Sequence, residues 1–313
     1  MGRALAAGSV DAAMRAAAEY GMGQMSIDLG DHGAARNHFA TSLTSYESVG
    51  DRAGVASALN GLVVVAVNRY DYDEARVLGE RALRLYRELA DERGVAVTLY
   101  NLAMIAREQG DLAGASAGYE ESLALWRRRD EMVWTAETVL ALAITRRMDG
   151  DAPGARALLD ESRPLYQKLG DPFGLALTDL EGGHLARQAG DVPTAARLYA
   201  AALRNFAEVG ANLGIVEALE WLAATAADQG AAVPALRLFG AAESTRRALE
   251  LPLPAASDAP VLERHARRAA DAASAEAAAA TAAGQALTLE QARVEALDLA
   301  RRLALEPPVS RPL

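Results

Sequence analysis

The sequence repeats itself every 40 residues, and this period constrains the fold more than any other feature. Aspartates stand at that interval, followed in the sixth register by an alanine: Asp31, Asp71, Asp111, Asp151, Asp191 and Ala231. An alanine follows each of these positions four residues later, and the residue eleven positions later is always small. Six registers that agree at one fixed period are typical of a stack of helical repeats.

Each period contains the pattern of two helices, which residues 71–110 illustrate. Asp71 can cap the first helix, whose apolar stripe includes Ala75 and Tyr86. Gly110 can end the second helix in a left-handed conformation. Because one helix pair cannot bury its apolar face alone, neighbouring pairs stack and share a core. We therefore expect an all-α protein, a right-handed α-solenoid superhelix of antiparallel helix pairs.

Two recurring side-chain types predict how the helices pack. The small residues eleven positions after the caps mark places where two backbones approach closely. Most units also carry an aromatic residue fifteen positions after the cap, and we expect it to fill the gap toward the next repeat. These aromatic residues are Tyr46, Tyr86, Trp126, Tyr166 and Phe206.

The period sets the predicted domain organisation. Helical repeats occupy 1–250, with a half unit at 11–30, full units at 31–70, 71–110, 111–150, 151–190 and 191–230, and a half unit at 231–250. The run 251–254 (LPLP) ends the pattern, since proline disfavours helix in the residue before it. A helical cap is expected over 251–305, with one long helix at 258–283. A capping box formed by Thr288 and Gln291 opens the last helix, and 306–313 is expected to be disordered.

The fourth unit departs from the common pattern. Pro164 lies inside its first helix, where proline removes a backbone hydrogen bond. Its second helix carries Asp179 at a position where neighbours have Leu or Val, and also Gly182 and Gly183. Two interpretations are open, a local kink in the array or a ligand or partner site.

Composition excludes several function classes. The chain lacks cysteine, which rules out disulfides and thiolate chemistry and favours a cytoplasmic location. A net charge of −10 disfavours direct contact with nucleic acid, and no apolar run is long enough to span a membrane. The four histidines (His32, His38, His184 and His265) form no metal-binding or catalytic pattern. We therefore expect no enzymatic activity, no catalytic residue, no metal and no cofactor.

The registers resemble the tetratricopeptide repeat. The residues that carry this resemblance are Leu102-Ala103, Gly110-Asp111, Ala115, Tyr119 and Ser122-Leu123. The 40-residue form is similar to the helical sensor region of large ATP-dependent bacterial transcriptional regulators, the MalT-like LuxR-type and AfsR-like families. The segments 237–254 and 286–300 resemble the part that closes this region in many such proteins.

This resemblance implies a non-catalytic scaffold for protein interaction and ligand sensing within such a regulator. The alternative is a free-standing repeat adaptor that mediates protein–protein assembly. Those regulators bind ATP through a GxxxxGK[ST] loop, and many carry a helix-turn-helix, but neither pattern occurs here. We therefore expect the sensor part alone, either as a fragment or as a stand-alone relative.

The resemblance also predicts the binding surface. In this family the first consensus helix of each repeat lines a concave groove, and the corresponding positions here include Tyr100, Met104, Arg107, Arg147, His184, Arg187, Glu217, Glu220 and Asp228. The expected partner is a protein or peptide segment or a small anionic inducer. Self-association through the repeat ends is a further expectation. The carboxylate clamp of chaperone-binding members is absent, because Tyr100, Leu140 and Met104 occupy its places.

Three of these residues, Arg107, Arg147 and Arg187, stand 40 residues apart. Stacked repeats are expected to align them as a ladder of guanidinium groups, which bind carboxylates and phosphates in bidentate fashion. The alternative is structural. Each arginine lies in the last turn of its predicted helix, where a cation offsets the helix dipole.

Overall fold

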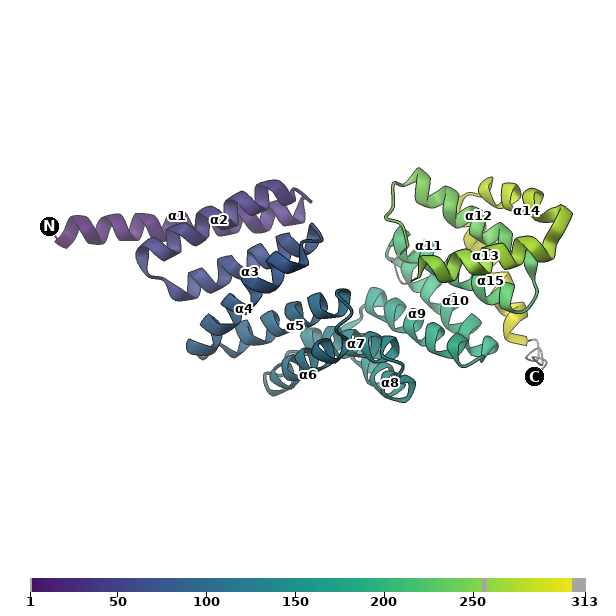
Figure 1. The fold of residues 1–313 in the computed structure, drawn as a ribbon, viewed down its shortest axis with the longest axis horizontal. Coiled ribbons are helices and arrows are strands. Elements are labelled where there is room, and N and C mark those ends of the chain that lie inside the picture. Colours follow the sequence, from purple (N-terminus) through teal and green to yellow (C-terminus); the bar gives the residue numbers. More distant parts are fainter. Residues whose placement is uncertain (1, 255–257, 306–313) are drawn as a thin grey trace. The chain divides into compact units, whose positions relative to one another are not determined.

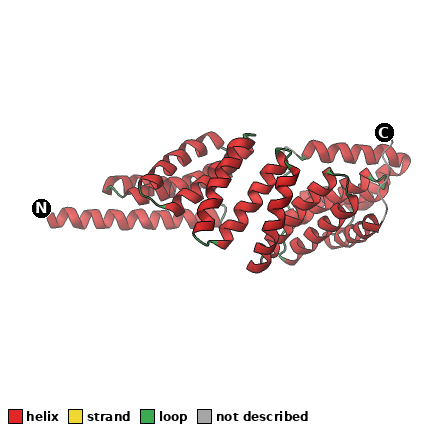
Figure 2. Ribbon diagram, turned by 90° about the horizontal axis from the view of Figure 1, so that it is seen from below, coloured by secondary structure: helices red, strands yellow, loops and turns green. Residues whose placement is uncertain are grey.

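The computed structural model describes the backbone of residues 2–254 and 258–305, and the side chains from residue 12 onward within those ranges. All regular elements in these ranges are helices, and they contain no strand (Figures 1 and 2). The prediction of an all-α repeat protein is confirmed. None of these helices is long and apolar enough to cross a bilayer. The predicted disordered tail, 306–313, lies outside the described residues.

The chain divides into two compact units, Met1–Ala155 and Arg156–Leu313, with the boundary inside α8. Helices that begin in the first unit are α1 (Gly2–Asp28), α2 (His32–Val49), α3 (Arg52–Asn68), α4 (Tyr72–Glu88), α5 (Glu92–Glu108), α6 (Leu112–Arg128), α7 (Met132–Met148) and α8 (Ala152–Leu169). The second unit continues with α9 (Pro172–Gln188), α10 (Val192–Glu208), α11 (Asn212–Asp228), α12 (Ala232–Ala248), α13 (Ala259–Ala273), the 3₁₀ turn η1 (Ser274–Glu276), α14 (Ala277–Gln285) and α15 (Leu289–Leu305). The predicted division at residue 250 stays a prediction.

Aspartate caps set the helix starts. The Asp71 carboxylate accepts the backbone N–H of Glu74, which confirms the predicted cap, and Asp31, Asp111, Asp151 and Asp191 act in the same way. Asp51 and Asp91 cap the second helices of their pairs by the same contact. Helices therefore begin about every 20 residues, twice as often as the sequence period, and each cap satisfies an otherwise unpaired helix N–H.

The ring of the recurrent aromatic residue packs against the next helix of its own 40-residue unit. A Cβ placed on Gly94, at the start of α5, would lie 2.2 Å from the ring of Tyr86, at the end of α4. The rings of Tyr46, Tyr166 and Phe206 approach the glycine eight residues later in the same way. The expectation that these rings fill the gap toward the next repeat is therefore wrong. In the third unit a tryptophan replaces the glycine, and Trp126 stacks on Trp134 with ring centroids 5.1 Å apart.

The small residues mark close approaches between helices, as predicted. The buried hydroxyl of Ser42 donates a hydrogen bond of 2.8 Å to the carbonyl of Ala16, on the helix before it. Ser122 makes the equivalent bond to Ala96, also at 2.8 Å. Both contacts join residues 26 positions apart. This spacing is the register in which the neighbouring helices α1/α2 and α5/α6 lie against one another.

The predicted single helix at 258–283 is wrong. It is broken at Ser274, which has a φ of 49°, and α14 then packs along α12 (Figure 1). Glycines permit this close packing, since a Cβ on Gly284 would lie 2.0 Å from the carbonyl oxygen of Arg237. The capping box before α15 is confirmed. The Thr288 N–H donates to Gln291, and the Gln291 N–H donates to the Thr288 hydroxyl.

Candidate functional site

The predicted groove residues fall into two groups, one in each unit. In the first unit are Tyr100, Met104 and Arg107 of α5 and Arg147 of α7. In the second unit are His184 and Arg187 of α9 and Glu217 and Glu220 of α11.

Tyr100 is the aromatic centre of the first group. Its ring meets the rings of Tyr119 and Trp134 edge-on, at centroid distances of 5.4 and 6.0 Å. Burial raises the pKa of the Tyr100 hydroxyl, which therefore stays protonated near neutral pH. Because α5, α6 and α7 all contribute to this aromatic cluster, Tyr100 is held in a fixed orientation.

Arg107 and Arg147 are the cations of the first group, and both are half-buried. The Arg107 side chain is 17% exposed, and its Nη2 lies 3.0 Å from Oε1 of Glu108. This ion pair is compatible with both interpretations of the arginine ladder, a binding surface or helix-end electrostatics. It leaves Arg107 partly accessible at the end of α5.

The hydroxyl of Tyr119 is a buried polar group that the sequence did not reveal. Tyr119 is completely buried, and its hydroxyl has no hydrogen-bond partner among the described residues. Burial raises its pKa, so the hydroxyl remains a neutral donor. A buried unpaired hydroxyl costs free energy, and it lies beside Tyr100, within the first group.

In the second unit, His184 and Arg187 surround Trp221, a residue that the sequence analysis did not single out. Nδ1 of His184 lies 2.9 Å from the hydroxyl of Tyr199, and its ring centroid lies 4.7 Å from that of Trp221. The guanidinium carbon of Arg187 lies 4.8 Å from the Trp221 ring centroid, in a cation–π contact. These contacts bring the two predicted residues of α9 together on α11.

Three cationic or titratable side chains contact Asp228, at the end of α11. Its carboxylate lies 3.3 Å from Nη1 of Arg187, from Nε2 of His265 and from Nη1 of Arg268. Burial acts to raise the Asp228 pKa, but the hydrogen bond and charge of His265 and the charge of Arg187 outweigh it and hold the pKa below its usual range. We call these four residues the Asp228 cluster. It connects α13 to α9 and α11.

Glu220 forms a buried ion pair with Arg246 of α12, which sequence reasoning missed. Glu220 is 7% exposed and Arg246 6%, with Nη2 and Oε2 2.8 Å apart. These residues stand 26 positions apart, the same spacing as Ser42 and Ala16. That spacing is the signal that identifies the pair.

Glu217 lies one turn before Glu220 on α11. Burial, and next the charge of Glu220, raise the pKa of Glu217 to about 7. Two of the predicted groove residues of α11 contact other helices of the same chain. Glu220 forms its ion pair with α12, and Asp228 contacts His265 of α13. The partner-binding role of Glu217 and Glu220 stays a prediction.

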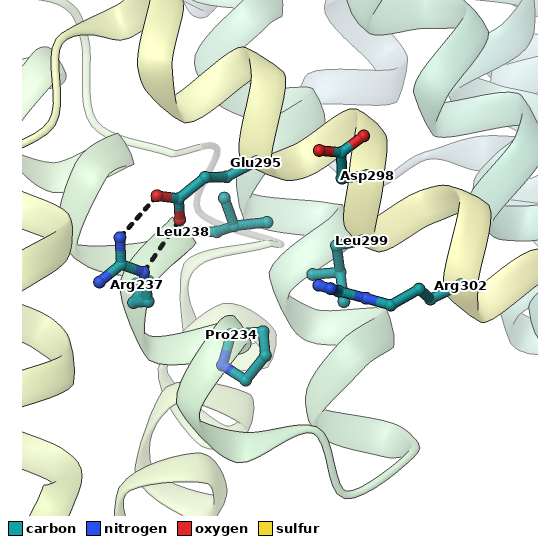
Figure 3. Close-up of a pocket in the computed structure, with 7 residues that line it drawn as sticks. All are labelled: Pro234, Arg237, Leu238, Glu295, Asp298, Leu299 and Arg302. Atoms are coloured by element: carbon teal, nitrogen blue, oxygen red, sulfur yellow. Dashed lines mark hydrogen bonds and ion pairs between the residues drawn. The ribbon is translucent and has the colours of Figure 1, made fainter.

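A small cleft between α12 and α15 is shown in Figure 3. Its volume is about 240 Å³, and the Arg237 and Glu295 side chains point toward each other across it, with Nε and Oε2 2.9 Å apart. This ion pair fastens α15 to α12. The volume of the cleft lies below the range of about 300–1,000 Å³ that is usual for small-molecule sites.

Some of the unusual residues of the fourth 40-residue repeat, 151–190, have a structural role. A Cβ on Gly183 would lie 2.6 Å from the ring of Tyr199, so the glycine makes room for that ring. The carboxylate of Asp179 is buried and forms an ion pair with Arg163 and a 3.3 Å hydrogen bond with Asn205. A groove of about 430 Å³ lies beside this carboxylate, so the partner-site interpretation stays open.

Among the described residues, no group of three His, Asp or Glu side chains is placed to hold a metal ion. The arrangement instead offers fixed aromatic rings and guanidinium groups on α5, α7, α9 and α11. Such groups bind other molecules through stacking and charge-assisted hydrogen bonds.

Comparison with known proteins agrees with the helical-repeat fold. Residues 14–88 and 94–168 match the family model of the tetratricopeptide repeat. The fold is similar to that of BtubC (BKLC) from P. vanneervenii, with a TM-score of 0.58 and 21% identity over 66% of this chain and 86% of that one. It is also similar to apo RapI, with a TM-score of 0.59 and 11% identity over 83% of each chain. No curated protein matches the chain.

Proposed function

We propose that this chain, which contains tetratricopeptide repeats at residues 14–88 and 94–168, is a non-catalytic scaffold that binds a segment of a partner protein. Repeats of this kind are typical of protein-interaction modules, because stacked helix pairs present an extended concave surface. The scaffold role follows from the repeats, and the residues that receive the partner are our proposal.

One observation carries the choice of surface. Arg107 and Arg147 occupy equivalent positions of α5 and α7, 40 residues apart, and both are half-buried. Tyr100 and Met104 lie on the same helix as Arg107, and Tyr100 is fixed by its aromatic neighbours. Tyrosine and arginine are enriched among the few residues that contribute most to binding energy at protein interfaces. We therefore assign α5 and α7 as the surface that binds the partner.

The chemistry of this surface favours a partner segment that carries carboxylates. A planar guanidinium matches a carboxylate in bidentate fashion. The same match admits a small anionic inducer, and self-association through the repeat ends remains a separate part of the proposal. We also place the protein in the cytoplasm, on the ground that its 313 residues include no cysteine.

Selection of random peptides displayed on phage against the immobilised chain tests this function. We expect the selected peptides to share one or two acidic positions. The Arg107→Ala/Arg147→Ala variant should lose them. A matched control, Arg81→Ala/Arg128→Ala, removes two exposed arginines from α4 and α6 and should retain them. Failure to select any peptide, or equal retention by both variants, would contradict the proposal.

We propose further that the scaffold is the sensor region of an ATP-dependent transcriptional regulator, and the alternative is a free-standing adaptor. The support is the resemblance of segments 237–254 and 286–300 to the closing part of such regions. The coding sequence on either side of the repeats decides between them. A P-loop domain in the same reading frame supports the regulator, and a reading frame that holds only the repeats supports the adaptor.

A further inference from the structure

A second candidate binding site lies in the other compact unit, between α12, α13 and α14. Figure 1 shows where these three helices lie. This pocket has a volume of about 510 Å³. Small-molecule sites span about 300–1,000 Å³. Phe239 and Leu236 of α12 and Leu262 and Ala266 of α13 form its apolar walls. We call it the α12–α14 pocket. It shares no residue with the surface to which we assign the partner protein.

The walls of the pocket are fixed from two sides. On one side, α12 and α14 are in backbone contact, since a Cβ on Gly240 would lie 2.4 Å from the carbonyl oxygen of Thr281. On the other side, His265 and Arg268 hold α13 to Asp228. A pocket between helices that are already fixed binds a ligand without the cost of ordering its walls.

The charges that line the pocket select the class of ligand. Arg246 is a cation that lines the pocket, but its N–H groups already donate hydrogen bonds within the chain. Nε and Nη2 donate to Glu220, and Nη1 donates to the carbonyl of Pro252. An anionic ligand would have to break this buried pair. Two further lining carboxylates, Glu243 and Glu263, are 55% and 65% exposed.

These two carboxylates are available to a ligand. Each pairs with an arginine one turn further along its own helix, Glu243 with Arg247 at 2.6 Å and Glu263 with Arg267 at 3.2 Å. Glu243 also accepts a hydrogen bond of 3.1 Å from the exposed side-chain amide of Gln285. Both arginines are at least 70% exposed, and ion pairs between exposed side chains contribute little to stability. A ligand cation can therefore share or replace these partners at low cost.

We propose that the α12–α14 pocket binds a small organic cation, an alkyl or aryl group that carries a protonated amine. The apolar group packs against Phe239 and Leu262, and the ammonium group binds the carboxylates of Glu243 and Glu263. Apolar burial and charge complementarity then act in the same molecule, while the buried Glu220–Arg246 pair stays intact.

Titration calorimetry with three probes of similar shape tests the proposal: 2-phenylethylamine, 2-phenylethanol and phenylacetate. We expect the amine to bind with a Kd of about 1 mM or below. The alcohol should bind about tenfold more weakly, because it lacks the charge, and phenylacetate should bind more weakly still. Ethylamine is the control for general attraction of cations to an acidic protein, and it should not bind. Absence of amine binding, or equal binding of phenylacetate, would overturn the proposal.

Variants of the chain locate the binding. Ala266→Phe fills the pocket and should abolish amine binding while circular dichroism stays unchanged, and Ala266→Leu serves if the larger side chain prevents folding. Glu243→Gln/Glu263→Gln should weaken the amine about tenfold, to the level of the alcohol. The matched control Glu276→Gln/Glu290→Gln removes the same charge from other exposed positions of the second unit. If the control weakens binding as much, or if neither Ala266 variant affects it, the amine does not occupy this pocket.

Discussion

His184 and Tyr199 form a buried hydrogen bond in the second unit, with Nδ1 2.9 Å from the hydroxyl. The equivalent residues of the first unit, two periods earlier, are Met104 and Tyr119. Methionine cannot satisfy the tyrosine as an imidazole does, and the buried Tyr119 hydroxyl has no partner among the described residues. The tyrosine hydroxyl at this repeat position therefore has a hydrogen-bond partner in the second compact unit, whereas in the first it has none among the described residues.

This difference predicts opposite effects for two exchanges. His184→Met should destabilise the chain by about 1–3 kcal/mol, because it leaves the Tyr199 hydroxyl buried without this partner. Met104→His should give the Tyr119 hydroxyl a partner and stabilise the chain by about 1 kcal/mol. Urea denaturation of the two variants and the wild type measures both changes. Equal destabilisation by the two exchanges would show that the hydrogen bond is not the deciding interaction.

The contacts of the Asp228 cluster predict that Asp228 helps to hold α13 in its folded position. Of the side chains of α13, only Leu262 and Ala269 are fully buried, so ionic contacts to Asp228 supply much of its attachment. Asp228→Asn should therefore increase hydrogen exchange at the backbone amides of α13 about tenfold or more, while α10 keeps its protection. Asp271→Asn changes the same charge at an exposed site of α13 and is the control. Unchanged exchange of α13 in Asp228→Asn would show that apolar packing suffices to hold the helix.

The raised pKa of Glu217 predicts how the stability of the folded chain varies with pH. Burial holds the pKa of this carboxyl at about 7 in the folded chain, but its ordinary value in the unfolded chain is 4.5. Between these values the folded state binds more protons than the unfolded state, so stability falls as the pH rises from about 4.5 to about 7. The loss from this group is about 3 kcal/mol at most.

Glu217→Gln should remove this loss, so the variant should be more stable than the wild type at pH 8 and nearly equal to it at pH 4.5. Thermal unfolding across this pH range measures the effect, with Glu276→Gln as an exposed control. A variant that follows the pH profile of the wild type would exclude Glu217 as its cause.

The sequence predicted the fold because its regularities are local. The cap at Asp111, the turn at Gly110 and the capping box before α15 depend on a few neighbouring residues, and all are present. The second set of caps, at Asp51 and Asp91, stands 20 residues after the first set, and the sequence analysis did not single it out. The direction in which Tyr86 packs depends on the glycine eight residues later, so a pattern of single positions did not predict it.

The candidate site was less predictable because it depends on contacts between distant helices. The approach of His265 to Asp228 follows from the break at Ser274 and from the packing of α13 and α14, neither of which has a repeat register. The pair of Glu220 and Arg246 does have one, the spacing of 26 residues within helix pairs. Arg107 was placed correctly at the end of its helix, where its Glu108 contact is compatible with either interpretation of the arginines.

We propose that α5 and α7 bind a partner segment through Arg107 and Arg147. The affinity of the strongest selected acidic peptide, measured by titration calorimetry, is the sharpest test of this proposal. We predict that Arg107→Ala/Arg147→Ala weakens this affinity about 100-fold, equivalent to about 2.7 kcal/mol, while the melting temperature changes by only about 2 °C. The control Arg81→Ala/Arg128→Ala should bind as the wild type does. A double variant that melts much earlier but binds the peptide with unchanged affinity would contradict the claim and would assign both arginines to helix-end electrostatics.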